Sequence, residues 1–455
     1  MEYSDFFELS IVKILDQYRK GKLTATNIAQ ICIEKVERME PESLAWVSFD
    51  PKKLLDQAKV SDERLRNRGP LRQVEGIPVG IKDLFNTADF PTEMGSPIWK
   101  NFTPGNDARV VFYLKKEGAL IPGKTVTAEF GVHTLGKTLN PHDPTRTPGT
   151  SSSGSAVAIA TGMVPAAIGT QTAGSIVRPA SFCGIYGCKP SFGLIPRTGM
   201  LKTTDSLDTI GYFVLHFEDL NRMFDVLRVH GSNYPISDAA FNDKKRQNKP
   251  SSRPWRVAFV KTHTWEFAPN YAQNAIIDWI KKLSSEENIS VEEVNVPLMM
   301  NESHVVHSII YDKSLSYYFV DEFKEDTLIS QTMKDMISHG NSISINQYRE
   351  ALIKQEKMAH SMEEFFNNFD IVISLSTSGE APLRNEIERP DPALMWTMTH
   401  LPVVSAPVFV SPDGLPFGAQ IVARRYNDGL LFKFCNYLRE MNLIPALSNP
   451  LLANK

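Results

Sequence analysis

A lysine that closes an apolar run is the first residue in this sequence with a clear chemical use. Lys82 follows the stretch Gly-Ile-Pro-Val-Gly-Ile at 76–81, which has the short, apolar character of a buried strand. A lysine in this position often simply points to solvent. Held inside the protein it would be desolvated, its pKa would fall, and the neutral amine could act as a general base.

Two runs of small residues supply groups on which such a base could act. Residues 147–155 read Thr-Pro-Gly-Thr-Ser-Ser-Ser-Gly-Ser, and residues 169–180 read Gly-Thr-Gln-Thr-Ala-Gly-Ser-Ile-Val-Arg-Pro-Ala. The turn before Ser175 exposes successive backbone N–H groups, as an oxyanion hole requires. Such composition is also typical of flexible linkers, but the apolar segments interleaved here favour a packed site.

A serine nucleophile needs a base, and no histidine stands out for that role. His133 and His142 are close in sequence, but either can be structural. Neither run contains a Gly-x-Ser-x-Gly elbow. A Ser–Lys arrangement is the remaining known solution.

Taken together, these segments resemble the amidase signature family, whose members use a Ser-cisSer-Lys triad. The family stretches Gly-Gly-Ser-Ser-Gly-Gly-Ser and Gly-Thr-Asp-Thr-Gly-Gly-Ser match residues 149–155 and 169–175. The two aligned serines, Ser151 and Ser175, are 24 residues apart, as in other members. The resemblance covers nearly the whole chain. Further matches lie at residues 123–125, 140–141, 182–184, 189–191, 206–208 and 413–418.

The resemblance implies a role for each matched residue. Ser175 would be the nucleophile, Ser151 the serine on a cis peptide bond that relays the proton, and Lys82 the neutral base. Attack on an amide would give an acyl-enzyme, release ammonia or an amine, and end with hydrolysis by water. We expect no cofactor and no metal. The oxyanion hole would consist of the backbone N–H groups of Thr172, Ala173 and Gly174.

Departures from the common family pattern bear on the substrate. Gly, Asp and Gly of that pattern are replaced by Thr150, Gln171 and Ala173. Arg178 stands one place later than the family's arginine, and on a helix that begins near Ser175 it would share the face of that serine. With residues 92–96, this resembles the malonamidase branch, which acts on small amides of dicarboxylic acids. We therefore expect a small acyl amide, with Arg178 binding its carboxylate. The alternative is that Arg178 pairs with a structural acid.

Two other functions stay open. The A-type subunit of a tRNA-dependent amidotransferase, which hydrolyses glutamine and passes ammonia to a partner, shares the triad. The changes at Gln171 and Arg178 and the lack of an evident basic face for tRNA argue against it. A non-catalytic binding protein on the same scaffold is the other hypothesis, and the intact triad argues against that.

One motif in the chain points to different chemistry. Residues 118–125 match the phosphate-binding pattern Gly-x-x-x-x-Gly-Lys-Thr letter for letter, but that loop needs a strand before its first glycine and a helix at its lysine. Here residues 108–117 have a helical pattern, residues 119–121 read as a strand, and Pro122 removes an N–H that would bind phosphate. The expected order of elements therefore argues against an NTPase.

The elements that must position these residues alternate between strand and helix. Residues 1–75 show helical periodicity, residues 76–235 hold the triad, residues 270–368 are largely helical, and residues 369–455 return to the sheet pattern. Because β-rich segments flank the helical middle, we predict one amidase domain, 1–455, with an insertion at 270–368 that shapes the substrate pocket. The predicted fold class is α/β, with a mixed, mostly parallel central sheet covered by helices on both faces.

The composition fits such an enzyme. The 455 residues carry 49 Lys and Arg against 52 Asp and Glu, and a net charge of −3 argues against nucleic-acid binding by bulk positive charge. Four scattered cysteines argue against a disulfide framework. The chain shows no signal-peptide pattern and no membrane-spanning stretch. We therefore expect a cytoplasmic protein whose partner is a small-molecule amide, with no nucleic-acid or membrane partner and with a homodimer as a further possibility.

Overall fold

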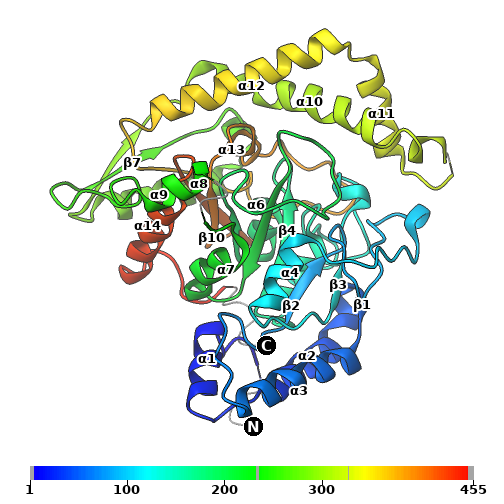
Figure 1. Ribbon diagram of the computed structural model, residues 1–455. Helices are drawn as coiled ribbons and strands as arrows, with labels where there is room; N and C mark the ends of the chain where they lie inside the picture. The colour runs from blue at the N-terminus through cyan, green and yellow to red at the C-terminus, as the bar shows by residue number, and fades with distance from the viewer. Residues whose placement is uncertain (1–4, 232–234, 326, 449–455) are drawn as a thin grey trace.

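A mixed sheet of eleven strands runs through the described residues, 5–231, 235–325 and 327–448, of the computed structural model (Figure 1). In chain order the strands are β1 (Trp46–Phe49), β2 (Val79–Lys82), β3 (Gly123–Thr125), β4 (Ala166–Gln171), β5 (Tyr186–Lys189), β6 (Thr209–Val214), β7 (Trp255–Phe259), β8 (Ile289–Glu293), β9 (Ile371–Leu375), β10 (Val403–Val410) and β11 (Pro416–Ala423). Across the sheet their order is β1-β3-β2-β4-β6-β5-β10-β11-β9-β7-β8.

Neighbouring strands form both parallel and antiparallel pairs. Four pairs are parallel, namely β2 with β3 and β4, and β7 with β8 and β9. The pairs β1–β3, β4–β6, β5–β6, β5–β10, β10–β11 and β9–β11 are antiparallel. The prediction of a mixed sheet is confirmed. The prediction that most strand pairs are parallel is wrong, because only four of these ten pairs are parallel. The connection between β10 and β11, residues 411–415, is too short for a parallel crossover, so this pair must be antiparallel.

Helices cover both faces of the sheet, as predicted. Along β9, Ile371 and Ile373 belong to the larger hydrophobic core, whereas Val372 between them belongs to a second one, because successive side chains point to opposite faces. The larger core includes α5, α9 and α14, and the second includes α10, α12 and α13. The helices are α1 (Ile11–Arg19), α2 (Ala25–Ser43), α3 (Pro51–Arg66), α4 (Arg109–Lys116), α5 (Ser153–Ala160), α6 (Val177–Cys183), α7 (Leu220–Leu227), α8 (Pro235–Asn242), α9 (Asn270–Ser284), α10 (Ser303–Tyr318), α11 (Gln331–Ser342), α12 (Ile345–Phe365), α13 (Leu394–Met398) and α14 (Asp428–Glu440).

The two regions expected to be helical each contribute an edge strand. Within residues 1–75, β1 lies between α2 and α3 and pairs with β3. Within residues 270–368, β8 follows α9 and pairs with β7 at the opposite edge. Figure 1 shows α10, α11 and α12 gathered along one side of the molecule. Because both regions complete the same sheet, neither is separated from the rest by a break in the architecture; the division into functional regions stays a prediction.

The observed elements rule out a phosphate-binding loop at residues 118–125. α4 ends just before Gly118, which has a φ of +94°, and β3 lies within the motif. Lys124 is fully buried on β3, and its Nζ lies 3.0 Å from Asp83 Oδ1. The lysine of the motif is thus a buried ion-pair partner.

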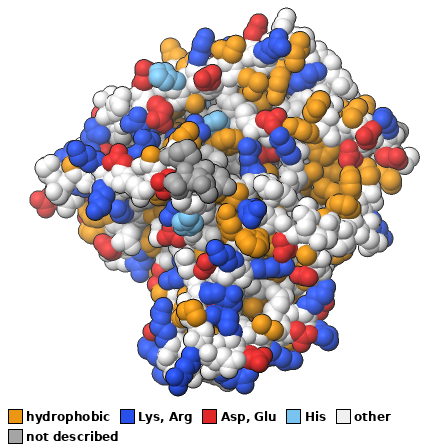
Figure 2. Space-filling model, viewed as in Figure 1, with side chains coloured by type: hydrophobic (Ala, Val, Ile, Leu, Met, Phe, Trp, Pro, Cys, Tyr) orange, Lys and Arg blue, Asp and Glu red, His pale blue; other side chains and the backbone are white. Residues whose placement is uncertain are grey.

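The surface and the cysteines agree with the composition. On the face shown in Figure 2, acidic and basic side chains are interspersed. All four cysteines are buried and free. Within the described residues, no helix combines the length and apolarity needed to span a membrane.

Candidate active site

The side chain of Lys82 ends among three hydroxyl groups. Lys82 is the last residue of β2 and is fully buried. Its Nζ lies 2.7 Å from Thr170 Oγ1, 2.8 Å from Ser151 Oγ and 2.9 Å from Ser152 Oγ. Thr170 lies on β4, the parallel neighbour of β2, and the two serines directly precede α5. Two adjacent strands and one helix start therefore bring the cluster together.

The surroundings of Lys82 favour its neutral form. Burial lowers its pKa well below 10.5, and the negative charge of Asp208 opposes that shift only in part. A neutral amine has two N–H donors and one lone pair. Because the Ser152 hydroxyl donates to Thr170 O at 3.1 Å, Ser152 must accept from the amine. Ser151 Oγ has no other hydrogen-bond partner among the described residues, so its proton is available to the lone pair of Nζ.

The peptide bond between Thr150 and Ser151 is cis, at the place where the resemblance implies such a bond. Gly149, just before it, has a φ of +86°, and a Cβ at this position would lie 2.8 Å from Pro179 Cα. Only glycine allows this close approach of the loop to α6. The loop that carries Ser151 is therefore fixed against the helix that follows Ser175.

Residues 172–176 form the connection from β4 to α6, with Ser175 near its end. No acceptor for the backbone N–H groups of Ala173, Gly174 or Ser175 is found among the described residues. Ser175 is only 7% exposed. A Cβ on Gly174 would lie 1.6 Å from Asp391 Oδ2, so a larger residue does not fit. Successive free N–H donors beside a nearly buried serine are suited to binding an oxyanion.

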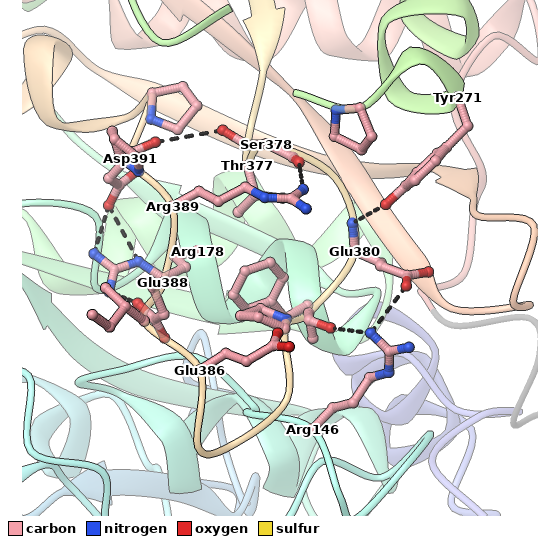
Figure 3. A pocket seen from close by; sticks show the side chains of 17 residues that line it. Arg146, Arg178, Tyr271, Thr377, Ser378, Glu380, Glu386, Glu388, Arg389 and Asp391 are labelled. Atoms are coloured by element: carbon pink, nitrogen blue, oxygen red, sulfur yellow. Dashed lines mark hydrogen bonds and ion pairs between the residues drawn. The ribbon is translucent and has the colours of Figure 1, made fainter. Parts of the chain in front are cut away.

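Arg178 is held by two carboxylates of the protein itself (Figure 3). Its Nη2 and Nε lie 2.7 and 3.3 Å from Asp391 Oδ2, and its Nη1 contacts Glu388 and donates to Thr150 Oγ1 at 3.1 Å. Of the two roles open to Arg178, pairing with a structural acid is the one present in this structure. Its charge is therefore compensated before any substrate arrives.

Two cavities border Arg178. The larger, about 650 Å³, reaches Thr150 and Ala173, the neighbours of the proposed relay serine and of Gly174. The smaller, about 170 Å³, is drawn in Figure 3, and residues 386–391 line both. Ser175 lines neither cavity, so the larger one meets the nucleophile loop at Ala173.

Three histidines, His133, His304 and His307, line the larger cavity. Burial lowers the pKa of His133 and His307 to about 4, and it also lowers that of His304. These imidazoles are therefore neutral near pH 7. The sequence-adjacent His142 contacts the carbonyl of Cys183 at 3.1 Å. No group of three or more metal-binding side chains is found within the described part of the chain.

Several contacts in the site were not predicted from the sequence. Ser152 and Thr170 bind Lys82, although both lie inside the runs singled out for their composition. Both residues belong to the matched motifs that contain Ser151 and Ser175, and this closeness in sequence could have predicted that they lie near Lys82. Asp391 and Glu388 lie more than 200 residues after Arg178, in a loop with no recognisable motif. Nothing local in the sequence connects them to the nucleophile.

A model of the amidase family, described simply as amidase, matches residues 27–432. The chain belongs to the amidase family. It is accordingly an amidohydrolase that acts on amide C–N bonds. The match is to the family as a whole, and membership of the malonamidase branch stays a prediction.

Relatives and solved structures match this chain over nearly its full length. The chain is 26% identical over 470 residues to an A-type subunit of the glutamyl-tRNA(Gln) amidotransferase of Clostridium acetobutylicum, covering 94% of this chain and 97% of the relative. Peptide amidase from Stenotrophomonas maltophilia superposes with a TM-score of 0.83 at 21% identity, covering 98% of this chain and 99% of that one. An inhibitor-bound structure of a vestigial protein complex, which reveals the evolutionary origins of an s-triazine catabolic enzyme, gives a TM-score of 0.85 at 23% identity and covers 97% of this chain and 100% of that one. At these identities the two structures establish a shared fold.

Replacing Ser151 by Ala should remove the hydroxyl beside Lys82 and lower the rate of amide hydrolysis by about 10³-fold or more, as loss of a triad member does in other serine hydrolases. Ser152→Ala is the matched control, because it removes a hydroxyl equally close to Nζ but leaves the Lys82–Ser151 contact. We expect it to lose no more than about tenfold. Ammonia release under identical conditions measures both, and equal losses in the two variants would contradict the assignment of Ser151.

Proposed function

We propose that this enzyme hydrolyses amides through an acyl intermediate on Ser175, with Ser151 as the proton relay and Lys82 as the base. The observation that carries the proposal is the 2.8 Å contact between Lys82 Nζ and Ser151 Oγ. That contact is made by a buried amine whose pKa burial lowers, which favours the unprotonated base that the mechanism needs. A charged lysine could not accept the proton.

In the first half of the reaction, Ser175 Oγ attacks the amide carbonyl while its proton passes to Ser151 and the Ser151 proton passes to Lys82. The carbonyl oxygen becomes an oxyanion, which the N–H groups of Thr172, Ala173 and Gly174 stabilise. The C–N bond then breaks, and the proton held on Lys82 returns through Ser151 to the departing ammonia or amine. In the second half, water attacks the acyl ester along the same proton route and releases the carboxylic acid.

We further propose that the substrate amide is glutamine and that the ammonia is passed to a partner subunit. Support comes from the curated relative of nearly full length, the A-type subunit of a glutamyl-tRNA(Gln) amidotransferase. Two departures from the family pattern, at Gln171 and Arg178, count against this function in the sequence. Both side chains make contacts inside the protein, so neither is free to meet a substrate in this structure.

Ammonia release from glutamine by the purified chain, with and without partner subunits from the same organism, tests this function. We expect slow glutamine hydrolysis by the chain alone and a clear increase when the partners are added. A panel of small carboxylated, aliphatic and aromatic amides serves as the comparison, and Ser175→Ala is the blank. Fast turnover of a small amide that partners do not change would refute the amidotransferase role and leave the acyl-enzyme mechanism standing.

A second candidate, a small acyl amide that carries a carboxylate, has one contact in its favour. Arg178 Nη1 binds Thr150 at the wall of the larger cavity, and Glu388 occupies the same nitrogen from a loop. The Glu388 side chain is 23% exposed, whereas that of Asp391 is 8% exposed. Glu388 is thus the exchangeable partner, and a substrate carboxylate can take its place while Asp391 stays.

Glu388→Gln tests this second candidate. The neutral amide competes less well for Arg178, so KM for a carboxylated amide should fall by roughly tenfold, the value of one hydrogen bond to a charged group, while KM for a neutral amide stays constant. Glu386→Gln on the same loop is the control, since in the described part of the chain the Glu386 carboxylate makes only a weak contact, 3.3 Å from the Leu383 N–H. Unchanged KM values for both substrates in Glu388→Gln would exclude an acidic acyl group at Arg178.

A further inference from the structure

The side chain of Gln171 spans the loop that carries the proposed nucleophile. Gln171 is the last residue of β4 and is completely buried. Its Oε1 accepts hydrogen bonds from the N–H groups of Ile176 and Val177, at 2.8 and 3.0 Å. Its Nε2 donates to Thr397 Oγ1 at 3.0 Å. One amide therefore ties the start of α6 to α13.

Thr397 completes this connection. Its single hydroxyl proton is donated to the carbonyl of Ala173 at 2.6 Å, so its oxygen must accept from Gln171. The direction of every hydrogen bond in the chain Gln171–Thr397–Ala173 is thereby fixed, because the other end of the Gln171 amide accepts two backbone N–H groups. The network is buried, and each of its side-chain nitrogen and oxygen atoms has a hydrogen-bond partner, which holds its members rigidly.

Fixing the carbonyls of this loop also fixes its N–H groups. In a planar trans peptide unit the C=O and the following N–H point in opposite directions. Thr397 holds the Ala173 carbonyl and so orients the N–H of Gly174. In the same way His307, 3.0 Å from the Thr172 carbonyl, orients the N–H of Ala173. The N–H of Arg178 binds the Gly174 carbonyl at 2.8 Å and orients the N–H of Ser175.

The sequence of this chain suits that arrangement. The common family pattern carries Asp at the position of Gln171, and an ionised Asp has no proton to donate to Thr397. The amide of Gln171 supplies both an acceptor and a donor and adds no negative charge beside a developing oxyanion. We propose that Gln171 and Thr397 act as a pair of positioning residues that aim the Gly174 N–H at the oxyanion. This rests on the proposed function of residues 172–175.

The test compares hydroxyl loss at two buried threonines near the end of α13. Thr397→Val keeps the shape of the side chain and removes its hydrogen bonds. We expect kcat to fall about 10- to 100-fold with KM within about twofold, less than the 10²–10³ lost when an oxyanion donor is deleted, because here the donor is misaimed. Thr397→Ser restores the hydroxyl and should restore kcat. Thr399→Val is the matched control, since within the described residues the Thr399 hydroxyl binds only the Met395 carbonyl; its kcat should stay within about twofold of the parent enzyme.

A second variant covers the case in which Thr397→Val does not fold. Gln171→Glu keeps the acceptor for the Ile176 and Val177 N–H groups, loses the donor to Thr397 and places a charge near the oxyanion. The kcat of Gln171→Glu should fall at least as far as that of Thr397→Val. The loss should grow as pH rises through the pKa of the introduced carboxyl group, because its charged form cannot donate to Thr397.

Labelling of Ser175 by a fluorophosphonate separates failure of this proposal from failure of the proposed function. If Ser175 of the parent enzyme does not react, the acyl-enzyme mechanism is wrong. If it reacts and Thr397→Val reacts and turns over at the parent rate, only the positioning role is overturned. Parallel losses of kcat in Thr397→Val and Thr399→Val would also overturn it, because they would reflect a general loosening of α13.

Discussion

A buried lysine without a carboxylate partner is the constraint on which this site depends. Among the described residues, Lys82 Nζ contacts hydroxyl groups and no carboxylate lies within ion-pair distance. Lys124, on the adjacent strand and equally buried, lies 3.0 Å from Asp83. The same residue type therefore serves two purposes on neighbouring strands. Burying an unpaired ammonium is costly, and at Lys82 this cost lowers the pKa of the amine and favours its neutral form.

The charges that the site does contain are paired close to where they lie. Arg178 is neutralised by Asp391 and Glu388, and Asp391 packs against Gly174 so tightly that no Cβ fits between them. Gln171 holds the same loop with a neutral amide. An oxyanion forming there meets backbone dipoles, and in a poorly solvated pocket such preorganised dipoles are effective.

The sequence was most informative where function fixes local spacing. Motifs predicted a site of Lys82, Ser151 and Ser175, of which the Lys82–Ser151 contact is present in the structure, and helical periodicity located α4. The direction of a strand could not be predicted from the sequence pattern, because an apolar run such as 403–410 looks the same in a parallel and in an antiparallel pair. The four-residue β1 was hidden between two strong helices. The sequence-distant partners of Arg178 and Gln171 come from residues 388–397, and only the folded sheet brings these beside the loop.

The pH dependence of Ser175 acylation tests the neutral base most directly. The rate of fluorophosphonate labelling would be followed from about pH 5 to about pH 10.5, the ordinary pKa of lysine. Because burial lowers the pKa of Lys82, the rate should rise with one protonation step and reach its plateau well below pH 10.5, and Lys82→Met should remove that step with most of the rate. A rate still rising at pH 10.5, or one that Lys82→Met leaves unchanged, would contradict the account.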